Sequence, residues 1–181
     1  CLMPLTMMQT AYWRDADTLW NRALELDPAN HKAHGNLSML RVAEGDYEAA
    51  LAHQLETVKT FPGSSYYDNL GVTYFRLGRI PEAIATFQRA LQTGPSNVSA
   101  SFHLGVAYCA GNQPDEAERT FDTIGGKTAG FYMSTAEVFL GYGYADRAMK
   151  RLKEGKRMDP AHPGLAQAFE RARTSKANPV N

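Results

Sequence analysis

Histidine is the residue type whose spacing in this sequence comes nearest to a metal or catalytic site. His31 and His34 lie close together at a predicted helix start, where two imidazoles could touch one metal ion. Neither belongs to an HExxH motif or a triad-like arrangement, and Gly125-Gly126 lacks the strand and the lysine of a phosphate-binding loop. We therefore expect no catalytic residue, no metal and no cofactor in this chain.

Two asparagines offer a different chemistry. Asn36 and Asn69 each directly precede a leucine, Leu37 and Leu70. A side-chain amide has a donor and an acceptor, so it can pair with the backbone of an extended peptide without reading the peptide's side chains. The alternative is that the two amides cap turns or face water. Peptide binding requires both amides to face one surface, which depends on the elements that carry them.

The overall charge argues against a general electrostatic binder. Lysine plus arginine and aspartate plus glutamate number 19 each, so the chain lacks the basic excess of proteins that bind nucleic acid or a membrane surface. The charge is uneven, with nine basic and fourteen acidic residues over 1–125 and ten basic and five acidic residues over 126–181. Apolar residues make up 44%, as in globular proteins, and Cys1 and Cys109 suggest no disulfide framework.

One pattern recurs along the chain with a period of about 34 residues. A leucine–glycine pair before a tyrosine, an alanine before a phenylalanine one helical turn later, and a closing proline return at this interval. The residues are Leu70, Gly71, Tyr74, Ala83 and Phe87, then Leu104, Gly105, Tyr108, Ala117 and Phe121, with Pro28, Pro62 and Pro95 as closing prolines. This pattern resembles the tetratricopeptide repeat, and the segment 64–97 matches it almost in full. The resemblance implies an all-α, right-handed superhelical solenoid of stacked antiparallel helix pairs.

The repeat pattern predicts about four full helix pairs within a solenoid over 13–176. The expected units are an apolar extension (1–12) that Pro4 makes a poor helix, a half repeat (13–28), helix pairs (31–62, 64–95, 98–125 and a divergent 130–159), a capping helix (163–175) and a frayed tail (177–181). We expect Gly78 to end one helix in the left-handed conformation and Gly71 to lie at a close helix contact. The family pattern also puts a large packing residue at His34, which favours a core role over metal binding.

Resemblance to this family implies that ligands bind a concave groove lined by the first helix of each pair. Helical spacing assigns eight residues to this predicted groove. They are Lys32, Asn36, Met39, Asp68, Asn69, Arg76, Phe102 and His103. Asn36 and Asn69 would hold the ligand backbone, as in the asparagine ladder of the repeats in O-linked glycosyltransferases. Lys32 and Arg76 would meet acidic side chains, and Phe102 would supply an apolar anchor.

The first thirty residues carry a second resemblance. The runs Tyr12-Trp13-Arg14-Asp15 and Thr18-Leu19-Trp20 resemble the junction of protein-mannosyltransferase-like membrane enzymes, in which a last transmembrane helix leads into a C-terminal repeat domain. Cys1–Met8 would then be the remainder of that membrane segment, and the missing initiator methionine indicates a processed product or a fragment. The alternative is that Trp13 and Trp20 are packing residues of a terminal repeat.

The N-terminal half repeat also predicts self-association. Repeat arrays need polar terminal caps, and here Leu19, Trp20 and Leu24 lack a partner helix. A head-to-tail contact, helped by the uneven charge, would form a homo-oligomeric ring or a filament. The alternative is that the partner helix lies outside this sequence.

We interpret the chain as a non-catalytic scaffold that binds an extended peptide or partner protein in the groove. The alternatives are an accessory C-terminal domain of a membrane-bound glycosyltransferase and a self-assembling structural subunit. The compartment is cytoplasmic by default, and extracytoplasmic if a membrane region precedes the chain. In that second case Asn97, in the triplet Asn97-Val98-Ser99, is the candidate glycosylation acceptor.

Overall fold

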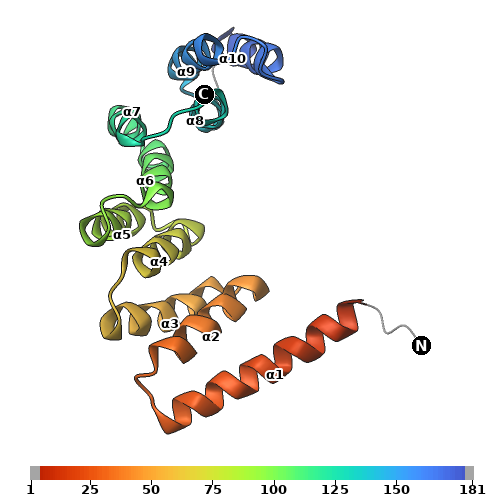
Figure 1. Ribbon diagram of the computed structural model, residues 1–181, viewed down its shortest axis with the longest axis vertical. Helices are drawn as coiled ribbons and strands as arrows, with labels where there is room; N and C mark the ends of the chain where they lie inside the picture. The colour runs from red at the N-terminus through yellow and green to blue at the C-terminus, as the bar shows by residue number, and fades with distance from the viewer. Residues whose placement is uncertain (1–4, 178–181) are drawn as a thin grey trace. The chain divides into compact units, whose positions relative to one another are not determined.

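The computed structural model describes residues 5–177, with side chains from 16 to 175, as ten α-helices without a strand (Figure 1). The helices are α1 (Leu5–Leu26), α2 (His31–Glu44), α3 (Tyr47–Thr60), α4 (Ser64–Arg76), α5 (Ile80–Thr93), α6 (Val98–Ala110), α7 (Pro114–Thr123), α8 (Ala129–Gly141), α9 (Ala145–Met158) and α10 (Leu165–Ala177). The predicted all-α fold built from helix pairs is confirmed. None of these helices is both long enough and apolar enough to cross a membrane.

The chain divides into two compact units, and the solenoid expected over 13–176 stays a prediction. The boundary between Ala100 and Ser101 falls in the first turn of α6. In the first unit α2 pairs with α3 and α4 with α5, while α1 packs on α2 and α3 on α4. In the second unit α8 pairs with α9, and α10 packs on both of these helices.

A left-handed residue ends the first helix of every pair. Gly45, Gly78 and Gly143 have φ angles of 80°, 72° and 81°, and Asn112 takes the same place in α6–α7 with φ 56°. At Gly78 the backbone N–H donates to the Phe75 carbonyl at 3.0 Å, so the turn closes tightly. Asparagine tolerates this conformation better than most other side chains do. The left-handed turn expected at Gly78 is confirmed.

The first helix is longer than the sequence indicates. The half repeat is expected to begin at residue 13 after a poorly helical segment, yet α1 runs through 22 residues from Leu5. Pro4 directly precedes this helix in the sequence. A proline breaks a helix when it lies inside it and is tolerated at or before the first turn, where the N–H has no partner. At the other end, α10 begins at Leu165, inside the predicted cap (163–175), and continues to Ala177, the first residue of the predicted tail; residues 178–181 lie outside the described residues.

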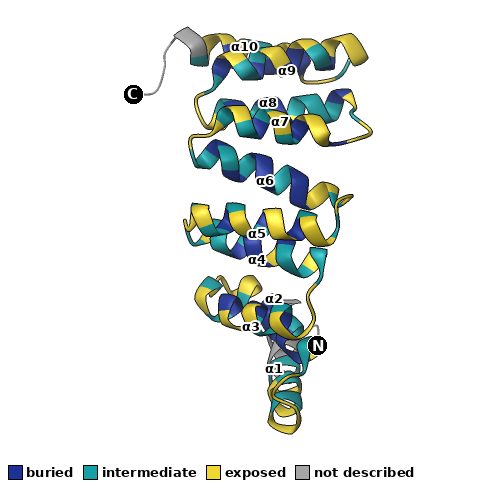
Figure 2. Cartoon of the chain, turned by 90° about the vertical axis from the view of Figure 1, so that its left-hand side faces the viewer, coloured by how far each residue is buried: buried dark blue, intermediate teal, exposed yellow. Residues whose placement is uncertain are grey.

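A glycine and an aromatic ring fill the space between the two helices of a pair. A Cβ atom at Gly71 would lie 2.5 Å from a ring carbon of Phe87, and one at Gly105 would collide with the ring of Phe121. The close approach expected at Gly71 is confirmed, and Gly105 makes the same kind of contact. Both rings are almost fully buried, and Figure 2 shows such buried positions as stripes along the helices of each pair. We call this combination, a glycine on the first helix and a ring on the second, the glycine–ring pair.

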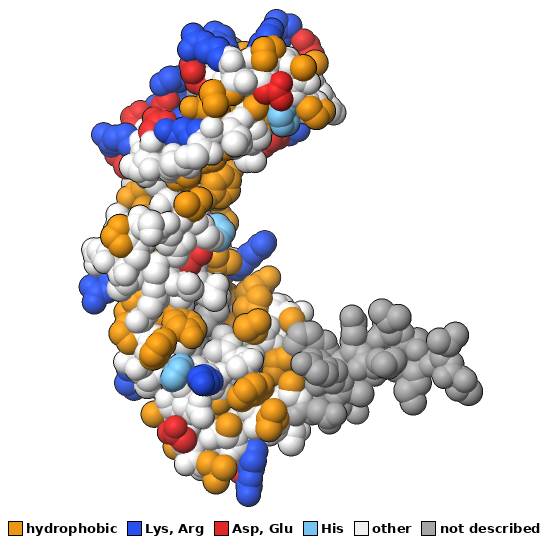
Figure 3. All heavy atoms as spheres, in the orientation of Figure 1, with side chains coloured by type: hydrophobic (Ala, Val, Ile, Leu, Met, Phe, Trp, Pro, Cys, Tyr) orange, Lys and Arg blue, Asp and Glu red, His pale blue; other side chains and the backbone are white. Residues whose placement is uncertain are grey.

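Ion pairs join α7 to α9 in the second unit. The carboxylate of Glu118 accepts from Arg147 and from Lys150 (2.6 Å), and Arg151 donates to Asp122 (2.6 Å). Burial opposes the ionisation of Glu118, but the hydrogen bond and charge of Lys150 and the charges of both arginines lower its pKa. Figure 3 shows acidic and basic side chains intermixed over this region. Part of the charge difference along the sequence is therefore neutralised inside this unit.

Candidate functional site

The α2–α3 hairpin departs from the glycine–ring pair. One repeat before Gly71 and Phe87 the sequence has Ser38 and Gln54. Ser38 is 5% exposed, and its hydroxyl donates to the Gly35 carbonyl at 2.7 Å. Gln54 is 6% exposed, and its Oε1 atom is buried without a hydrogen-bond partner. A buried acceptor without a partner is rare in folded proteins, so this hairpin interior has a polar group that still requires a donor.

Two adjoining clefts lie beside this polar pair in the first unit. The first, which we call the Trp20 cleft, has a volume of about 240 Å³ and is lined by Trp20, His31, Lys32, Gly35, Asn36, Ser38, Met39, Gln54, Thr57, Tyr66 and Asn69. The second, the Arg76 cleft, has a volume of about 400 Å³ and is lined by Ser38, Met39, Val42, Ala43, Tyr47, Gln54, Asn69, Val72, Thr73 and Arg76. Because both linings include Gln54, Asn69 and Met39, the two clefts form one continuous surface.

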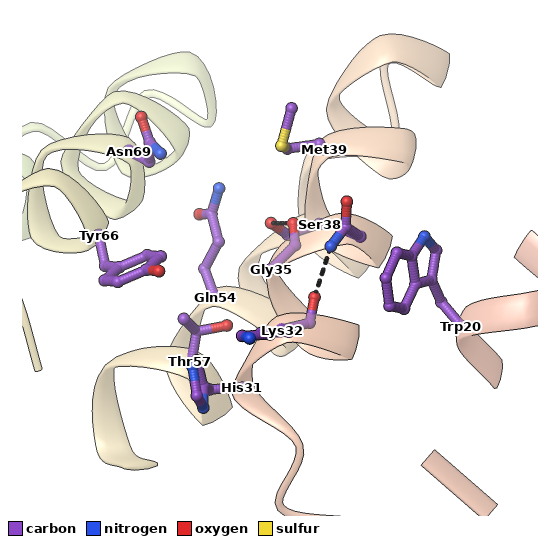
Figure 4. A pocket seen from close by; sticks show the side chains of 11 residues that line it. Trp20, His31, Lys32, Gly35, Ser38, Met39, Gln54, Thr57, Tyr66 and Asn69 are labelled. Atoms are coloured by element: carbon purple, nitrogen blue, oxygen red, sulfur yellow. Dashed lines mark hydrogen bonds between the residues drawn. The ribbon is translucent and has the colours of Figure 1, made fainter. Parts of the chain in front are cut away.

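Helices α1 to α4 all contribute to the Trp20 cleft. Figure 4 shows Trp20 on one side, Tyr66 and Asn69 from α4 on the other, and the side chain of Gln54 extending between them. Two ring contacts fix the wall around Tyr66. His31 stacks on Phe61 with 4.5 Å between ring centroids, and Phe61 meets Tyr66 edge to face at 5.8 Å. The cleft therefore has aromatic walls and an amide at its floor.

Most of the predicted groove residues of the first unit meet at these clefts. Asn36, Asn69, Lys32 and Met39 line the Trp20 cleft, and Arg76 lines the other. Asn36 also donates from its amide nitrogen to the Lys32 carbonyl at 2.7 Å, the bond drawn in Figure 4. This bond lies within α2, and it leaves the amide oxygen available to a ligand.

Three predicted groove residues occupy other surroundings. Asp68 is only 6% exposed and does not line either cleft. Phe102 and His103 lie on α6 in the second unit, and both are half-buried. The ring of Phe102 packs against Phe121 with 5.5 Å between centroids. Its apolar surface thus contributes to the core of the second unit. The prediction differs because helical spacing alone does not separate a groove position from a core position.

His34 is a buried packing residue, as the repeat pattern predicts. It is 8% exposed, and its Nε2 atom lies 3.0 Å from the Pro28 carbonyl oxygen. Its Nδ1 atom lies 3.0 Å from Nδ1 of His53, so both ring nitrogens are engaged. Burial, together with the charges of His34 and Arg41, lowers the pKa of His53. Among the side chains that the structure describes, from 16 to 175, no three His, Cys, Asp or Glu residues gather to hold a metal ion.

Glycosylation at Asn97 and self-association through α1 stay predictions. The amide nitrogen of Asn97 donates to the Ser64 hydroxyl at 2.8 Å, and its oxygen accepts from the Ala100 backbone at 3.0 Å. A glycan on that nitrogen would replace the first bond. In α1, Leu19 is 60% exposed while Trp20 and Leu24 are half-buried, so an exposed apolar residue for self-association is present.

Sequence reasoning missed Ser38 and Gln54, which line both clefts. Ser38 and Gln54 are departures from the repeat. Helical spacing assigned the groove to one stripe on the first helix of each pair, and Ser38 lies outside that stripe while Gln54 lies on the second helix, α3. A signal was present, because the equivalent positions of the other pairs hold Gly71 with Phe87, Gly105 with Phe121, and Ala136 with Leu152. Among these four helix pairs, only α2–α3 has a polar residue at both positions.

Comparison with known proteins agrees with this architecture. Two sequence models of the tetratricopeptide repeat match residues 12–65 and 74–131. The TPR repeat-containing protein MJ1428 of Methanocaldococcus jannaschii is 23% identical over 120 residues, which are 66% of this chain and 21% of that protein. The human Protein O-mannosyl-transferase TMTC2 is 29% identical over 104 residues, which are 52% of this chain and 12% of that protein. The chain thus spans about a fifth or less of the length of these curated relatives.

A solved structure shows the same fold. The crystal structure of YrrB, described as a TPR protein with an unusual peptide-binding site, superposes with a TM-score of 0.71 at 18% identity. The match covers 91% of this chain and 87% of YrrB. The recurring period, the helix pairs with their glycine–ring contacts and the two matching sequence models all agree. The chain belongs to the tetratricopeptide repeat family.

Proposed function

We propose that the first unit binds an extended peptide along the Trp20 and Arg76 clefts. Membership of the tetratricopeptide repeat family indicates a protein–protein interaction module. The observation that carries the finer proposal is that Asn36 and Asn69, from α2 and α4, line one cleft together with the apolar surfaces of Trp20 and Met39. YrrB, which shares the fold, is described as having a peptide-binding site of its own.

The chemistry of the lining favours an uncharged or acidic peptide. Asn36 and Asn69 can each pair with a peptide backbone group, because an extended backbone has unpaired N–H and C=O groups along its length. Lys32 and Arg76 are exposed, and the described residues that line the two clefts include no aspartate or glutamate. A basic peptide would meet only like charge here, whereas an acidic side chain would pair with either cation.

The double variant Asn36→Ala with Asn69→Ala tests this proposal. A peptide selected from a randomised display library with the wild-type chain serves as the probe, and fluorescence anisotropy gives its affinity. We expect the variant to bind about 1–3 kcal/mol more weakly, because two hydrogen-bonding groups are removed. The melting temperature should be nearly unchanged, since Asn69 is exposed and Asn36 bonds only to its own helix.

Asn21→Ala is the matched control. Asn21 lies on α1 and donates to the Asp17 carbonyl one helical turn earlier at 2.9 Å, the same kind of bond that Asn36 makes. It is not in the lining of either cleft, so we expect the control to bind the peptide as the wild type does. Equal affinity of the wild type and the double variant would exclude the two amides from binding.

A second candidate function rests on the human relative. Because TMTC2 is a protein O-mannosyl-transferase and matches 52% of this chain, an accessory domain of a membrane-bound glycosyltransferase is the alternative. In that case the groove would bind the acceptor polypeptide, and the catalytic site would lie in another part of the parent protein. The sequence of the full gene distinguishes the two candidate functions, because the glycosyltransferase alternative requires several apolar membrane-spanning segments encoded before Cys1.

A further inference from the structure

The amide of Gln54 is the least satisfied polar group beside the Trp20 cleft. Its Oε1 atom is buried without a hydrogen-bond partner, and the residue as a whole is only 6% exposed. Phe87, Phe121 and Leu152 occupy the equivalent place in the other pairs, and all three are apolar and almost fully buried. A repeat whose only role was to pack would have an apolar side chain at position 54, since a buried acceptor without a partner destabilises the fold.

We propose that the Trp20 cleft recognises a carboxamide side chain, asparagine or glutamine, of the bound peptide, and that Gln54 is the residue that selects it. This inference rests on the proposed peptide-binding function. The torsion that turns the terminal amide of glutamine is soft, so Gln54 can present its oxygen or its nitrogen to the cleft without moving its backbone. A peptide carboxamide then donates to Oε1 and accepts from Nε2, so each amide has both its donor and its acceptor group paired.

Other side chains fit this cleft less well. A carboxylate could pair with Lys32, but it has no hydrogen to donate, so Oε1 of Gln54 would stay unpaired. A lysine or arginine could donate to Oε1, but the described lining includes the cation Lys32 and no acidic residue. An aliphatic side chain would contact Trp20 and Met39 and would again leave the acceptor unpaired. A carboxamide offers a donor, an acceptor and methylene groups for the aromatic wall.

A positional-scanning peptide array tests the selection directly. The probe is an array built on the library-selected peptide, with each position replaced in turn by all twenty amino acids. We expect one position at which asparagine or glutamine binds about tenfold more tightly than leucine, as one or two additional hydrogen bonds provide. Enrichment of an acidic, basic, hydroxyl or apolar residue at every position would overturn the inference.

Two variants locate the selection at Gln54. Ser38→Gly with Gln54→Phe rebuilds the glycine–ring pair of α4–α5 and fills the floor of the cleft, so the preference for carboxamides should disappear. Gln54→Met keeps the length of the side chain and removes only its amide, so it should also abolish the preference. It serves as the test if the double variant does not fold. Gln92→Met, on the exposed surface of α5, is the matched control and should keep the preference. Circular dichroism verifies that each variant is folded.

The outcomes separate this inference from the function on which it rests. If no library member binds the wild type, peptide binding fails and the inference fails with it. If a peptide binds and the Asn36→Ala with Asn69→Ala variant weakens it, but no position prefers a carboxamide, peptide binding stands and the selection by Gln54 is wrong. A carboxamide preference that persists in Gln54→Met would likewise assign the selection to another residue.

Discussion

The two hairpins of the first unit, α2–α3 and α4–α5, share their construction and differ in their interior. Both turn at a left-handed glycine, Gly45 or Gly78, and both bury an alanine early in the second helix. Between the helices, however, α4–α5 encloses the ring of Phe87, whereas α2–α3 encloses the polar Ser38 and Gln54. The repeat therefore tolerates a polar interior in one hairpin when its neighbours are well packed. Under the proposed function, α4–α5 would contribute mainly stability and α2–α3 mainly recognition.

Truncating Phe87 and its equivalent Gln54 to alanine should give the largest difference in the free energy of unfolding between the two hairpins. Phe87→Ala should lower the free energy of unfolding by about 3–5 kcal/mol, because it removes a buried ring and leaves a cavity. Gln54→Ala should cost about 1 kcal/mol or less, because the packing that is lost is offset by removal of a buried acceptor without a partner. Urea denaturation followed by circular dichroism measures both values.

Hydrogen exchange then locates the effect. In a stack of repeats, loss of packing accelerates exchange first in the pair that carries the change, here α4–α5. Phe121→Ala in the second unit is the control for ring loss elsewhere, and it should destabilise α6–α7 instead. Equal costs for Phe87→Ala and Gln54→Ala would contradict the division between a stabilising and a recognising hairpin.

Much of the fold is predictable from the sequence because the repeat fixes local geometry. The recurring period, a glycine against a ring and a left-handed Gly78 each have a steric cause that one sequence already contains. The extent of α1 was not predictable in the same way. Pro4 lowers helix propensity within its own neighbourhood, but the helix begins just after it, at Leu5. Propensity near a helix end does not fix where the helix begins.

The site is less predictable because burial depends on neighbouring helices. Spacing places Asn36 and Asn69 on one surface, and both line the Trp20 cleft. The same spacing also assigns Asp68 to the groove, yet that residue is buried. Gln54 was missed because the groove was assigned to the first helix of each pair, whereas Gln54 lies on α3, the second helix of its pair. Comparing each repeat with its neighbours, position by position, is the step that would have found it.

Rebuilding the glycine–ring pair in the α2–α3 hairpin should change the free energy of unfolding by an intermediate amount. Ser38→Gly with Gln54→Phe removes the unpaired acceptor and buries a ring, while glycine in place of serine inside α2 costs about 0.5 kcal/mol of helix propensity. We expect a net gain of about 1 kcal/mol in the free energy of unfolding, measured by urea denaturation. Gln54→Phe alone should be less stable than the double variant, since the Ser38 side chain would meet the ring. A single variant as stable as the double one would mean that the two hairpins differ in more than this pair.

The smallest expected effect is a pH dependence confined to the first hairpin. His53 on α3 faces His34 on α2, with Arg41 and Asp17 nearby, and burial together with the charges of His34 and Arg41 lowers its pKa. The unfolded chain therefore binds a proton at His53 more readily than the folded chain. Stability should be constant above the ordinary histidine pKa of about 6.5, fall as the pH drops below it, and level off below the lowered pKa.

Urea midpoints measured between pH 8 and pH 5 test this dependence. His53→Gln should make the midpoint less sensitive to pH over this range, because the titrating group is gone while a polar side chain still faces His34. His162→Gln in the second unit is the control and should keep the wild-type slope. The positions equivalent to His34 and His53 in α4–α5 are Tyr67 and Thr86, so hydrogen exchange in α4–α5 should respond less to pH than exchange in α2–α3. A response of equal size in both hairpins would show that the titration acts on the whole unit and not on the histidine pair.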